Sequence, residues 1–389
     1  MDKIAVVGLG KAGLPIAAVI ADSDLEVTGI DIDEKRCQMI NSGKNPIPEE
    51  KGLGELVSRY GGNSLTAVSD YQLARDCTAF IIIVPLFIDK NNQPDYSILL
   101  DVVAKVGRIL KEGDVVILET TVPPLTTETL IKQTLEKESG LSLGDFYLAN
   151  SPERIMTGYS ISRLTEFPKI IGGVDKLSGE KAYQVYSRFI PNLYRVSSAR
   201  LAEFVKVIEG CYRDVNIALS NELLKIAEEI GVDIQEAIDT AKHEYCHLHQ
   251  PSTGVGGHCI PVYPWFLIKE MERRERSENA RLLRNARELN DEMADYWVDK
   301  IILECVKIDK PLKDIRICVK GITFREGVKE LYHSRNLEMV RRLMAKGLNV
   351  SVYDEMFTSG EIEQMGLKWC SGEEDIIFDG FKPEITRRE

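Results

Sequence analysis

The loop over residues 254–261 has the composition best suited to covalent chemistry. It reads Gly-Val-Gly-Gly-His-Cys-Ile-Pro, so the thiol of Cys259 closely follows Gly256 and Gly257. Two glycines leave the backbone uncovered beside the sulfur, which suits a nucleophile that must meet a bulky substrate. Most cysteines, however, are small buried hydrophobic residues. The composition of the loop alone therefore favours neither a catalytic nor a structural role for Cys259.

A second stretch, near the N-terminus, has the pattern of a phosphate-binding turn. Gly8-Leu9-Gly10-Lys11-Ala12-Gly13 follows the strand-like Ile4–Val7 and opens a helical pattern. In this order the first glycine makes a tight turn, the second lets the backbone approach a pyrophosphate, and the third allows the helix to pack on the strand. The diphosphate then lies at a helix N-terminus, beside Lys11 and Ala12, where amide groups favour negative charge.

An acidic residue completes this pattern. Asp31 ends the next strand-like run, at the spacing at which a carboxylate accepts hydrogen bonds from an adenosine ribose. Because its charge would repel a 2′-phosphate, we expect NAD rather than NADP as the cofactor. The alternative is a glycine turn that only joins a strand to a helix. The strand, the helix and the acidic residue together favour dinucleotide binding.

A doubly wound sheet is the element that must position these residues. The first part of the chain alternates β-branched runs with helical patterns, which is typical of a parallel α/β sheet of the Rossmann type. The segment Tyr96–Leu110 carries apolar residues at helical spacing. The predicted strands are Ile4–Val7, Leu25–Asp31, Ala79–Val84, Val115–Glu119, Phe146–Asn150 and Lys169–Ile171.

The pattern changes from about residue 200. Arg200–Ile230 and Ser277–Val306 each predict one long helix, with a Gly-, Pro- and His-rich loop between them. A smaller unit follows, with predicted strands Ile315–Val319 and Asn349–Tyr353 and a helix at Leu337–Lys346. We expect three domains: an NAD-binding domain over 1–195, a central helical domain with the cysteine loop over 196–308, and a smaller α/β domain over 309–389.

Bulk properties exclude some classes of protein. A net charge of −12 argues against a nucleic-acid binder. The longest apolar run, Ala79–Ile88, is too short to span a bilayer, and the N-terminus has no signal architecture.

The eight cysteines are scattered along the chain without paired spacing, which indicates reduced thiols, so we expect a cytoplasmic protein. Four histidines and Cys246 crowd residues 243–258, but their spacing fits no standard zinc site, so no metal is expected.

Three further segments accompany the cysteine loop. They are Glu119-Thr120-Thr121-Val122-Pro123-Pro124, then Ser151-Pro152-Glu153-Arg154, and then the helical Ala202-Glu203-Phe204-Val205-Lys206, which continues to Asn221-Glu222-Leu223. With the Gly-His-Cys-Ile-Pro loop they resemble the UDP-glucose and UDP-N-acetylhexosamine 6-dehydrogenase family, from Lys3 to about Asp354. The cysteine loop and Ser-Pro-Glu-Arg most resemble the branch that acts on UDP-N-acetylmannosamine or UDP-N-acetylglucosamine.

The resemblance implies an NAD-dependent, four-electron oxidation of a sugar C6 alcohol to a carboxylate. The aldehyde formed first is captured by the Cys259 thiolate, and a second oxidation leaves a thioester that water hydrolyses. By the same resemblance Lys206 stabilises an oxyanion, Thr121 positions a water, and Glu153 is an acid/base or orienting group. Without the motif context, structural roles are favoured: Lys206 as an exposed helix lysine, Thr121 as the end of a strand, and Glu153 as an ion-pair partner of Arg154.

The resemblance also implies where ligands bind. Pro85 and Thr121 would lie near the nicotinamide, and Arg325 would bind a diphosphate in two-pronged fashion. The central helices would form the core of a homodimer. The residues implied in substrate binding are Glu153, Arg154, Lys206, Gly256, Gly257, Tyr263 and Arg325.

Several features depart from the family pattern. The nucleotide-sugar-binding domain that the resemblance implies over 309–389 is shortened, and Pro85-Leu86-Phe87 stands where the family often has Thr and Pro. Gly210 stands where the family usually has Asn, and Tyr263 where it usually has Asp, so thioester hydrolysis is the step most affected. Tyr245 and Tyr332 stand where arginines are usual, which weakens the case for a UDP sugar.

Two other functions stay open. A single-step dehydrogenase related to the 6-phosphogluconate and 3-hydroxyacid enzymes needs no cysteine, so the Gly-Gly-His-Cys loop argues against it. A non-catalytic NAD- or nucleotide-sugar-binding protein is favoured by Gly210 and Tyr263, and disfavoured by the retention of Thr121, Lys206 and Cys259.

Overall fold

The computed structural model describes residues 3–155, 158–164 and 166–388. The chain forms two compact units, Met1–Val207 and Ile208–Glu389, which are described separately here. Helix α8, Ala199–Ile230, begins in the first unit and ends in the second.

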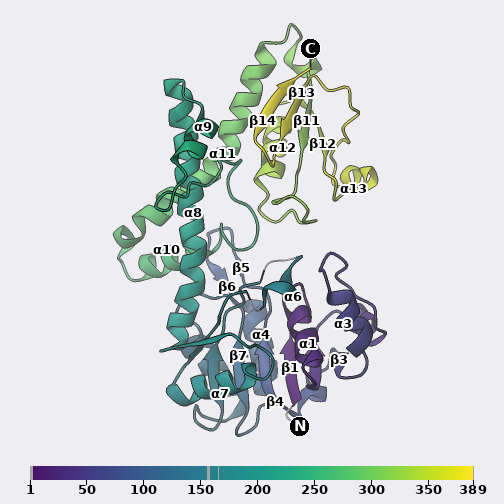
Figure 1. Ribbon diagram of the computed structural model, residues 1–389, viewed down its shortest axis with the longest axis vertical. Coiled ribbons are helices and arrows are strands. Elements are labelled where there is room, and N and C mark those ends of the chain that lie inside the picture. The colour runs from purple at the N-terminus through teal and green to yellow at the C-terminus, as the bar shows by residue number, and fades with distance from the viewer. Residues whose placement is uncertain (1–2, 156–157, 165, 389) are drawn as a thin grey trace. The chain divides into compact units, whose positions relative to one another are not determined.

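An eight-stranded sheet forms the centre of the first unit (Figure 1). Its strand order is β10-β9-β8-β7-β4-β1-β2-β3, and a separate hairpin pairs β5 with β6. The strands are β1 Lys3–Val7, β2 Val27–Ile30, β3 Leu65–Val68, β4 Cys77–Ile82, β5 Phe87–Ile88, β6 Pro94–Asp95, β7 Val115–Leu118, β8 Tyr147–Asn150, β9 Lys169–Gly173 and β10 Leu193–Val196.

Helices cover both faces of this sheet. The side chains of β1 alternate between two cores: Ile4 and Val6 pack with α1, α2 and α3, whereas Ala5 and Val7 pack with α4 and α5. This two-sided burial is the doubly wound arrangement expected from the sequence. The helices are α1 Gly13–Asp22, α2 Glu34–Asn41, α3 Leu53–Tyr60, η1 Tyr71–Ala74, α4 Ser97–Gly107, η2 Thr127–Ile131, α5 Lys132–Ser139, α6 Ser160–Arg163 and α7 Lys176–Tyr186.

The second unit joins helices to a four-stranded sheet of order β12-β11-β13-β14. Trp297, Val298 and Ile301 of α11 are buried with the apolar side chains of this sheet in one core. The elements that follow α8 are α9 Ile234–Ala241, α10 Tyr263–Arg273, η3 Ser277–Ala280, α11 Arg281–Val306, η4 Leu312–Asp314, β11 Arg316–Lys320, α12 Arg335–Ala345, β12 Asn349–Tyr353, α13 Ser359–Gln364, β13 Ile376–Asp379 and β14 Glu384–Arg387.

The predicted fold class is confirmed: a Rossmann-type α/β sheet, a region of long helices and a smaller α/β unit. All eight predicted strands are present within a few residues, as are both long helices. The strands that were not predicted are β3 and β10 of the large sheet, β5 and β6 of the hairpin, and β13 and β14 of the second unit. The large sheet is not wholly parallel, because β9 runs antiparallel to β8.

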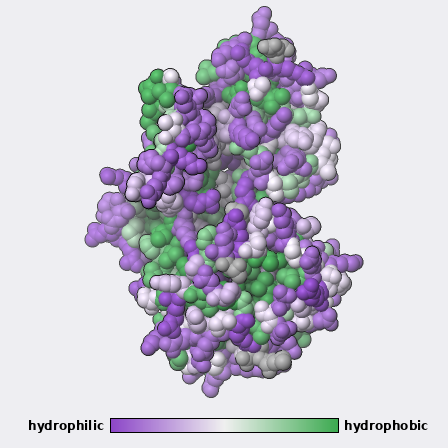
Figure 2. Space-filling view, in the orientation of Figure 1, coloured by the Kyte–Doolittle hydropathy of each residue, from purple (hydrophilic) through white to green (hydrophobic). Residues whose placement is uncertain are grey.

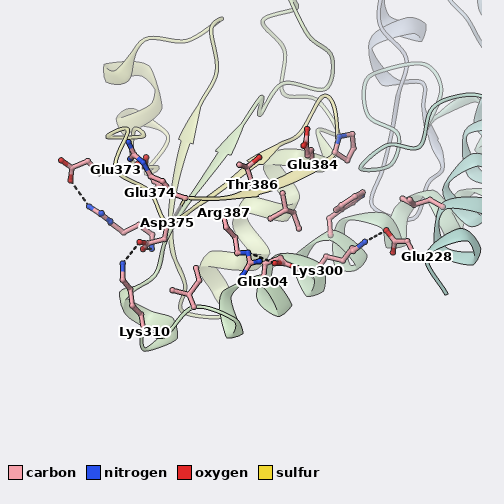
Figure 3. Close-up of a pocket in the computed structure, with 17 residues that line it drawn as sticks. Glu228, Lys300, Glu304, Lys310, Glu373, Glu374, Asp375, Glu384, Thr386 and Arg387 are labelled. Carbon is pink, nitrogen blue, oxygen red and sulfur yellow. Dashed lines mark hydrogen bonds and ion pairs between the residues drawn. The ribbon is translucent and has the colours of Figure 1, made fainter. Parts of the chain in front are cut away.

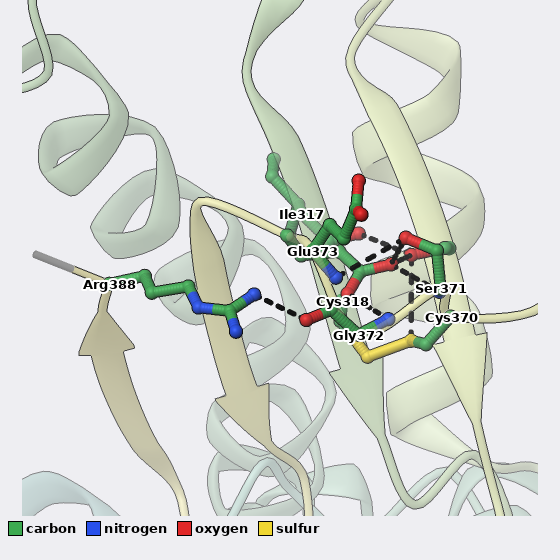
Figure 4. The surroundings of a disulfide bond; sticks show 9 residues. Ile317, Cys318, Cys370, Ser371, Gly372, Glu373 and Arg388 are labelled. Carbon is green, nitrogen blue, oxygen red and sulfur yellow. Dashed lines mark hydrogen bonds between the residues drawn. A yellow bond between two sulfur atoms is a disulfide. The ribbon is translucent and has the colours of Figure 1, made fainter.

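The prediction that all eight cysteines are reduced was wrong for one pair. Cys318 of β11 and Cys370 form a disulfide whose Cα atoms lie 5.9 Å apart (Figure 4). The backbone N–H of Cys370 donates to the carbonyl of Val352 on β12, the strand paired with β11, so the sheet itself brings the two sulfurs together. Sequence spacing could not show this, because the cysteines are 52 residues apart. The cytoplasmic location loses this support and stays a prediction.

Among the helices described, none is long and apolar enough to cross a membrane.

Candidate active site

The carboxyl ends of five neighbouring parallel strands carry the predicted residues of the first unit. In the order β2, β1, β4, β7, β8, these strands are followed by Asp31, Gly8, Pro85, Thr121 and Glu153. Because carboxyl ends of parallel strands meet at one edge of a sheet, residues scattered through the sequence are brought to one edge. This is the edge at which doubly wound sheets bind ligands.

The glycine turn has the geometry that a dinucleotide needs. Gly8 has φ +96°, and a Cβ there would lie 2.3 Å from the carbonyl oxygen of Ile83. A Cβ at Gly13 would lie 1.8 Å from the oxygen of Gly8, so this helix packs against the turn as predicted. A Cβ at Gly10 would meet nothing within 4 Å, which leaves open space where the pyrophosphate of a bound NAD would approach. The residues therefore fit the cofactor.

The carboxylate of Asp31 already holds the turn together. It accepts hydrogen bonds from the backbone N–H groups of Leu9 (2.8 Å) and Asp33 (2.9 Å). The guanidinium of Arg36 on α2 donates to the same carboxylate at 2.9 Å. Sequence reasoning missed Arg36, although a cation five residues after the acidic residue, at the start of a helix, was a usable signal. Lys11 is half-exposed and pairs with Glu49 at 3.7 Å.

A buried charged group supports the loop that carries Thr121. Glu119, directly after β7, pairs with Lys169 of β9 at 2.9 Å and accepts a hydrogen bond from the hydroxyl of Tyr186. Burial, with the neighbouring Glu119 charge, raises the pKa of the Tyr186 phenol well above its usual range. The phenol is therefore a permanent hydrogen-bond donor, which fixes the base of the loop.

Glu153 and Arg154 follow β8 and point to different partners. The backbone N–H of Glu153 donates to Glu119, and its carboxylate accepts the N–H of Ile155. The guanidinium of Arg154 donates to the carbonyl of Pro168 at 3.0 Å and lies over the ring of Phe167.

In the second unit, Cys259 is the exposed thiol. Of the free cysteines, Cys37, Cys77, Cys211 and Cys305 are buried, and Cys246 is partly exposed. Burial raises the pKa of Cys211 to about 12, which suits a structural thiol. The carbonyl of Cys259 accepts the N–H groups of Val262 and Tyr263, so Cys259 forms the turn that opens α10.

The glycines before Cys259 are required by close packing. A Cβ at Gly256 would lie 2.6 Å from the carbonyl oxygen of His333, and one at Gly257 would lie 2.8 Å from the ring of Phe324. The N–H of Gly257 donates to the carbonyl of Tyr332 at 3.0 Å. The loop is thus held against residues 324–333, the segment that contains Arg325.

Aromatic and acidic groups of that segment hold His258, the neighbour of the thiol. The imidazole pairs with Glu330 and stacks on Tyr332 with ring centroids 4.2 Å apart. Tyr332, which stands in place of a family arginine, therefore packs next to the cysteine loop. Tyr245, the other such position, is 87% exposed.

Gly210 and Tyr263 are packed against each other. A Cβ at position 210 on α8 would lie only 2.6 Å from the Tyr263 ring, which is 7% exposed. The ring therefore occupies the space that a side chain at 210 would need. The two departures from the family pattern are one coupled feature.

Comparisons with known proteins agree with this geometry. Residues 2–190 match the NAD binding domain of the UDP-glucose/GDP-mannose dehydrogenase family, and residues 200–292 match its central domain. The UDP-N-acetyl-D-mannosamine dehydrogenase of Methanococcus maripaludis is 36% identical over 97% of this chain and 85% of its own length.

The chain belongs to the UDP-glucose/GDP-mannose dehydrogenase family. It is therefore an NAD-dependent nucleotide-sugar dehydrogenase. The NDP-N-acetyl-D-galactosaminuronic acid dehydrogenase of Ralstonia nicotianae is also 36% identical, over 89% of this chain and 81% of its own. The structure of the UDP-D-ManNAc dehydrogenase from Pyrococcus horikoshii has a TM-score of 0.88 at 31% identity, over 97% of this chain and 88% of that one.

Polar side chains to which the sequence assigned no role support the cysteine loop of this dehydrogenase. Asn221 of α8 accepts the N–H of Ser252 at 2.7 Å and donates to Asn290 of α11 at 3.0 Å. The guanidinium of Arg335 donates to the carbonyl of Val255 at 3.1 Å. Asn221 lies in a quoted motif, but these contacts join elements far apart in the sequence, so the motif did not reveal its partners.

A pocket of about 1190 Å³ in the second unit of the dehydrogenase lies apart from these residues (Figure 3). Its lining comes from the ends of α8 and α11, from residues 373–375 and from β14, and includes none of the predicted site residues. Its cations pair with acids of the same lining, as Lys310 does with Asp375 at 2.5 Å and Arg387 with Glu304 at 3.3 Å. This mutual pairing gives it no excess of positive charge for a nucleotide.

Over residues 3–155, 158–164 and 166–388, no three His, Cys, Asp or Glu side chains are grouped so that they could hold a metal ion.

Proposed function

We propose that the enzyme oxidises the C6 primary alcohol of a UDP-N-acetylhexosamine to the uronate. UDP-N-acetylmannosamine is the first substrate to test, and UDP-N-acetylglucosamine the second. The names of the relatives from Methanococcus and Pyrococcus support this substrate class. The observation that carries the covalent mechanism is the exposure of Cys259, because four of the other five free cysteines are buried and Cys246 is only partly exposed.

The proposed chemistry divides a four-electron oxidation into two steps. NAD held at the glycine turn would supply the hydride acceptor for each oxidation, so two NAD molecules would be used per sugar, and each oxidation also releases one proton. After the first, the Cys259 thiolate adds to the aldehyde carbon and forms a thiohemiacetal. Loss of the second hydride leaves a thioester on Cys259. Water then attacks the acyl carbon, the C–S bond breaks, and the carboxylate and thiol are released.

The other predicted residues take roles around this thioester. Lys206, partly exposed on α8, would stabilise the oxyanion that forms at C6. Thr121 would position the hydrolytic water and contact the nicotinamide together with Pro85. Glu153 would act as an acid/base or orienting group.

We propose that the substrate is bound by a second set of residues. Arg325 would pair with the diphosphate, and Arg154 would contact the sugar nucleotide. Gly256, Gly257 and Tyr263 would line the sugar. Cofactor contacts would come from Gly8, Gly10, Lys11, Ala12, Gly13 and Asp31.

The organisation of the chain is part of the proposal. Residues 1–195 would bind NAD, 196–308 would carry the cysteine loop, and 309–389 would bind the nucleotide.

We further propose a homodimer built on α8. Seven large apolar side chains of this helix are exposed at helical spacing: Leu201, Phe204, Ile208, Tyr212, Leu219, Ile226 and Ile230. Figure 2 shows hydrophobic surface gathered at one end of α8.

Counting NADH tests the reaction. Purified enzyme is incubated with NAD and a panel of UDP-hexoses and UDP-N-acetylhexosamines, and NADH is measured per sugar consumed. Two NADH per sugar with a carboxylate product is the expected result. One NADH would indicate a single-step dehydrogenase or a stalled thioester, and mass spectrometry of the protein separates these. No NADH with any sugar would favour a binding protein.

A cysteine variant tests the covalent step. Cys259→Ser should abolish carboxylate formation and leave NAD binding intact. Cys246→Ser is the matched control, because Cys246 is a partly exposed free thiol on the preceding loop. Unchanged turnover of Cys259→Ser would refute the thioester.

A further inference from the structure

The loop over residues 120–127 is fixed at its two ends by two different elements. At the first end the hydroxyl of Thr120 accepts the N–H of Val84 at 3.0 Å and donates to the carbonyl of Val84 at 2.8 Å. Thr121 comes next and is followed by Val122 and two prolines, which have no N–H to donate. The course of the loop after Thr121 therefore depends also on how the second end is held.

A single carboxylate from α8 holds that second end. Glu203 accepts the N–H of Leu125 at 2.7 Å on one oxygen, and the N–H and hydroxyl of Thr127 at 2.8 and 2.6 Å on the other. Its side chain is 1% exposed. The carboxylate thus caps the N-terminus of η2 from another element, as an N-cap residue does from within a helix.

The backbone of the loop gives independent support for this anchoring. Leu125 has φ +83°, a conformation that residues with a Cβ rarely adopt. A residue keeps such a conformation when its surroundings fix it, and the N–H of Leu125 is one of the three donors to Glu203.

We propose that Glu203 is a positioning residue, which sets Thr121 relative to Lys206. Lys206 lies three residues after Glu203, so their side chains project from the same side of α8. One helical turn thereby carries the proposed oxyanion-binding cation and the anchor of the loop that carries Thr121. The roles of Thr121 and Lys206 rest on the proposed function.

Three variants test the proposal. Glu203→Gln replaces one acceptor oxygen by an NH₂ group. This new donor then faces other donors, either the N–H of Leu125 or the N–H and hydroxyl of Thr127. Glu203→Asp keeps the carboxyl group but shortens the side chain by one methylene. The matched control is Glu128→Gln, because Glu128 of η2 pairs with Arg200 of α8 and joins the same two elements on the surface.

Two measurements are made on each variant. Turnover is followed as NADH release with the nucleotide sugar identified above, together with the dissociation constant of NAD. Hydrogen exchange is followed on the peptide that contains Leu125 and Thr127, which needs no substrate. For Glu203→Gln we expect kcat to fall about 10- to 100-fold, since small misplacements of catalytic groups have effects of this size. We expect NAD affinity within about twofold of wild type and faster exchange of the peptide.

The control variants separate positioning from stability. Glu203→Asp should keep an intermediate kcat, and Glu128→Gln should stay within about twofold of wild type. Wild-type kcat in Glu203→Gln would overturn the proposal. Loss of NAD binding in parallel with kcat would overturn it too, because that result indicates a structural role. If Glu203→Gln does not fold, an unchanged peptide exchange rate and kcat in Glu203→Asp count against the proposal. If wild-type enzyme oxidises no nucleotide sugar, the proposed function fails, while the exchange experiment still tests the anchor.

Discussion

At position 210 any side chain would overlap with the ring of Tyr263. The family that the chain resembles usually has Asn at position 210 and Asp at position 263, and these two polar groups can bind a hydrolytic water. Here an aromatic ring and a glycine fill the same space. In the proposed mechanism, thioester hydrolysis would therefore be supported by other groups, of which Thr121 is one.

We predict that the two positions respond together to mutation. Gly210→Asn alone should destabilise the enzyme by about 1–3 kcal/mol, because overpacking costs this much. Tyr263→Asp alone should leave a cavity beside Gly210 and cost about 3–5 kcal/mol, as truncation of a buried aromatic does. The double variant should recover stability and hydrolyse the thioester faster than wild type. Urea unfolding and the decay of trapped acyl-enzyme measure both effects; additive changes would show that the residues are not coupled.

The carboxyl of Glu203 predicts a pH effect on stability. Burial raises its pKa from 4.5 to about 7. The folded state therefore binds the carboxyl proton of Glu203 more tightly than the unfolded state does. The resulting contribution to the free energy of unfolding is fully present below about pH 4.5 and is lost as pH rises through about 7. Its size is on the order of 3 kcal/mol.

Comparison with Glu203→Gln isolates that contribution. Free energies of unfolding are measured for both proteins in urea between about pH 4.5 and pH 8. Wild type should lose stability relative to the variant as pH rises through this window. Parallel pH profiles would show that Glu203 does not titrate differently in the two states.

At the scale of elements, sequence pattern served the buried parts best. Strands β1, β4 and β7 lie in the middle of the sheet, and their apolar runs made them visible. The strands of the large sheet that were missed, β3 and β10, are short and lie at its two edges, where part of each strand faces solvent. The other missed strands, β5, β6, β13 and β14, are each only two to four residues long. Helix α10 was missed because Pro264 and the preceding glycines are typical of a loop, although Pro is well tolerated in a first helical turn.

The candidate site divides in the same way. The glycine turn and Asp31 were predictable, because the cofactor fingerprint is local and each glycine has one steric reason. The carboxylate of Glu203 was within a quoted motif but had no visible partner, since Leu125 and Thr127 lie far away in the sequence. Arg335 and Asn221 also contact the segment around the cysteine loop from far away in the sequence, so only the folded structure reveals their hydrogen bonds.

The disulfide of the second unit predicts a redox effect on stability. Reduction of Cys318–Cys370 should lower the free energy of unfolding by about 2–4 kcal/mol, because the bond restrains a long segment of the unfolded chain. Urea unfolding with and without a thiol reductant measures the loss. The variant Cys318→Ser/Cys370→Ser should be insensitive to reductant, whereas Cys246→Ser should respond as wild type does. Identical stability with and without reductant would show that the bond does not form.

At the scale of the whole molecule, the exposed apolar stripe of α8 predicts a concentration-dependent dimer. Ile226→Glu, in the middle of one stretch of the stripe, should weaken self-association at least tenfold by placing a charge in an apolar interface. Arg213→Glu is the control, since Arg213 is exposed on a different side of the same helix. Sedimentation velocity over a range of concentrations measures both; a wild type that stays monomeric at high concentration would refute the dimer.

The contact between Gly210 and Tyr263 also bears on how such a pair can change in evolution. Each mixed pair should be less stable than either matched pair, because Asn beside Tyr is overpacked and Asp beside Gly leaves a cavity. Exchange of one matched pair for the other by single substitutions would therefore pass through a less stable protein, and relatives with a mixed pair should be rarer than relatives with either matched pair.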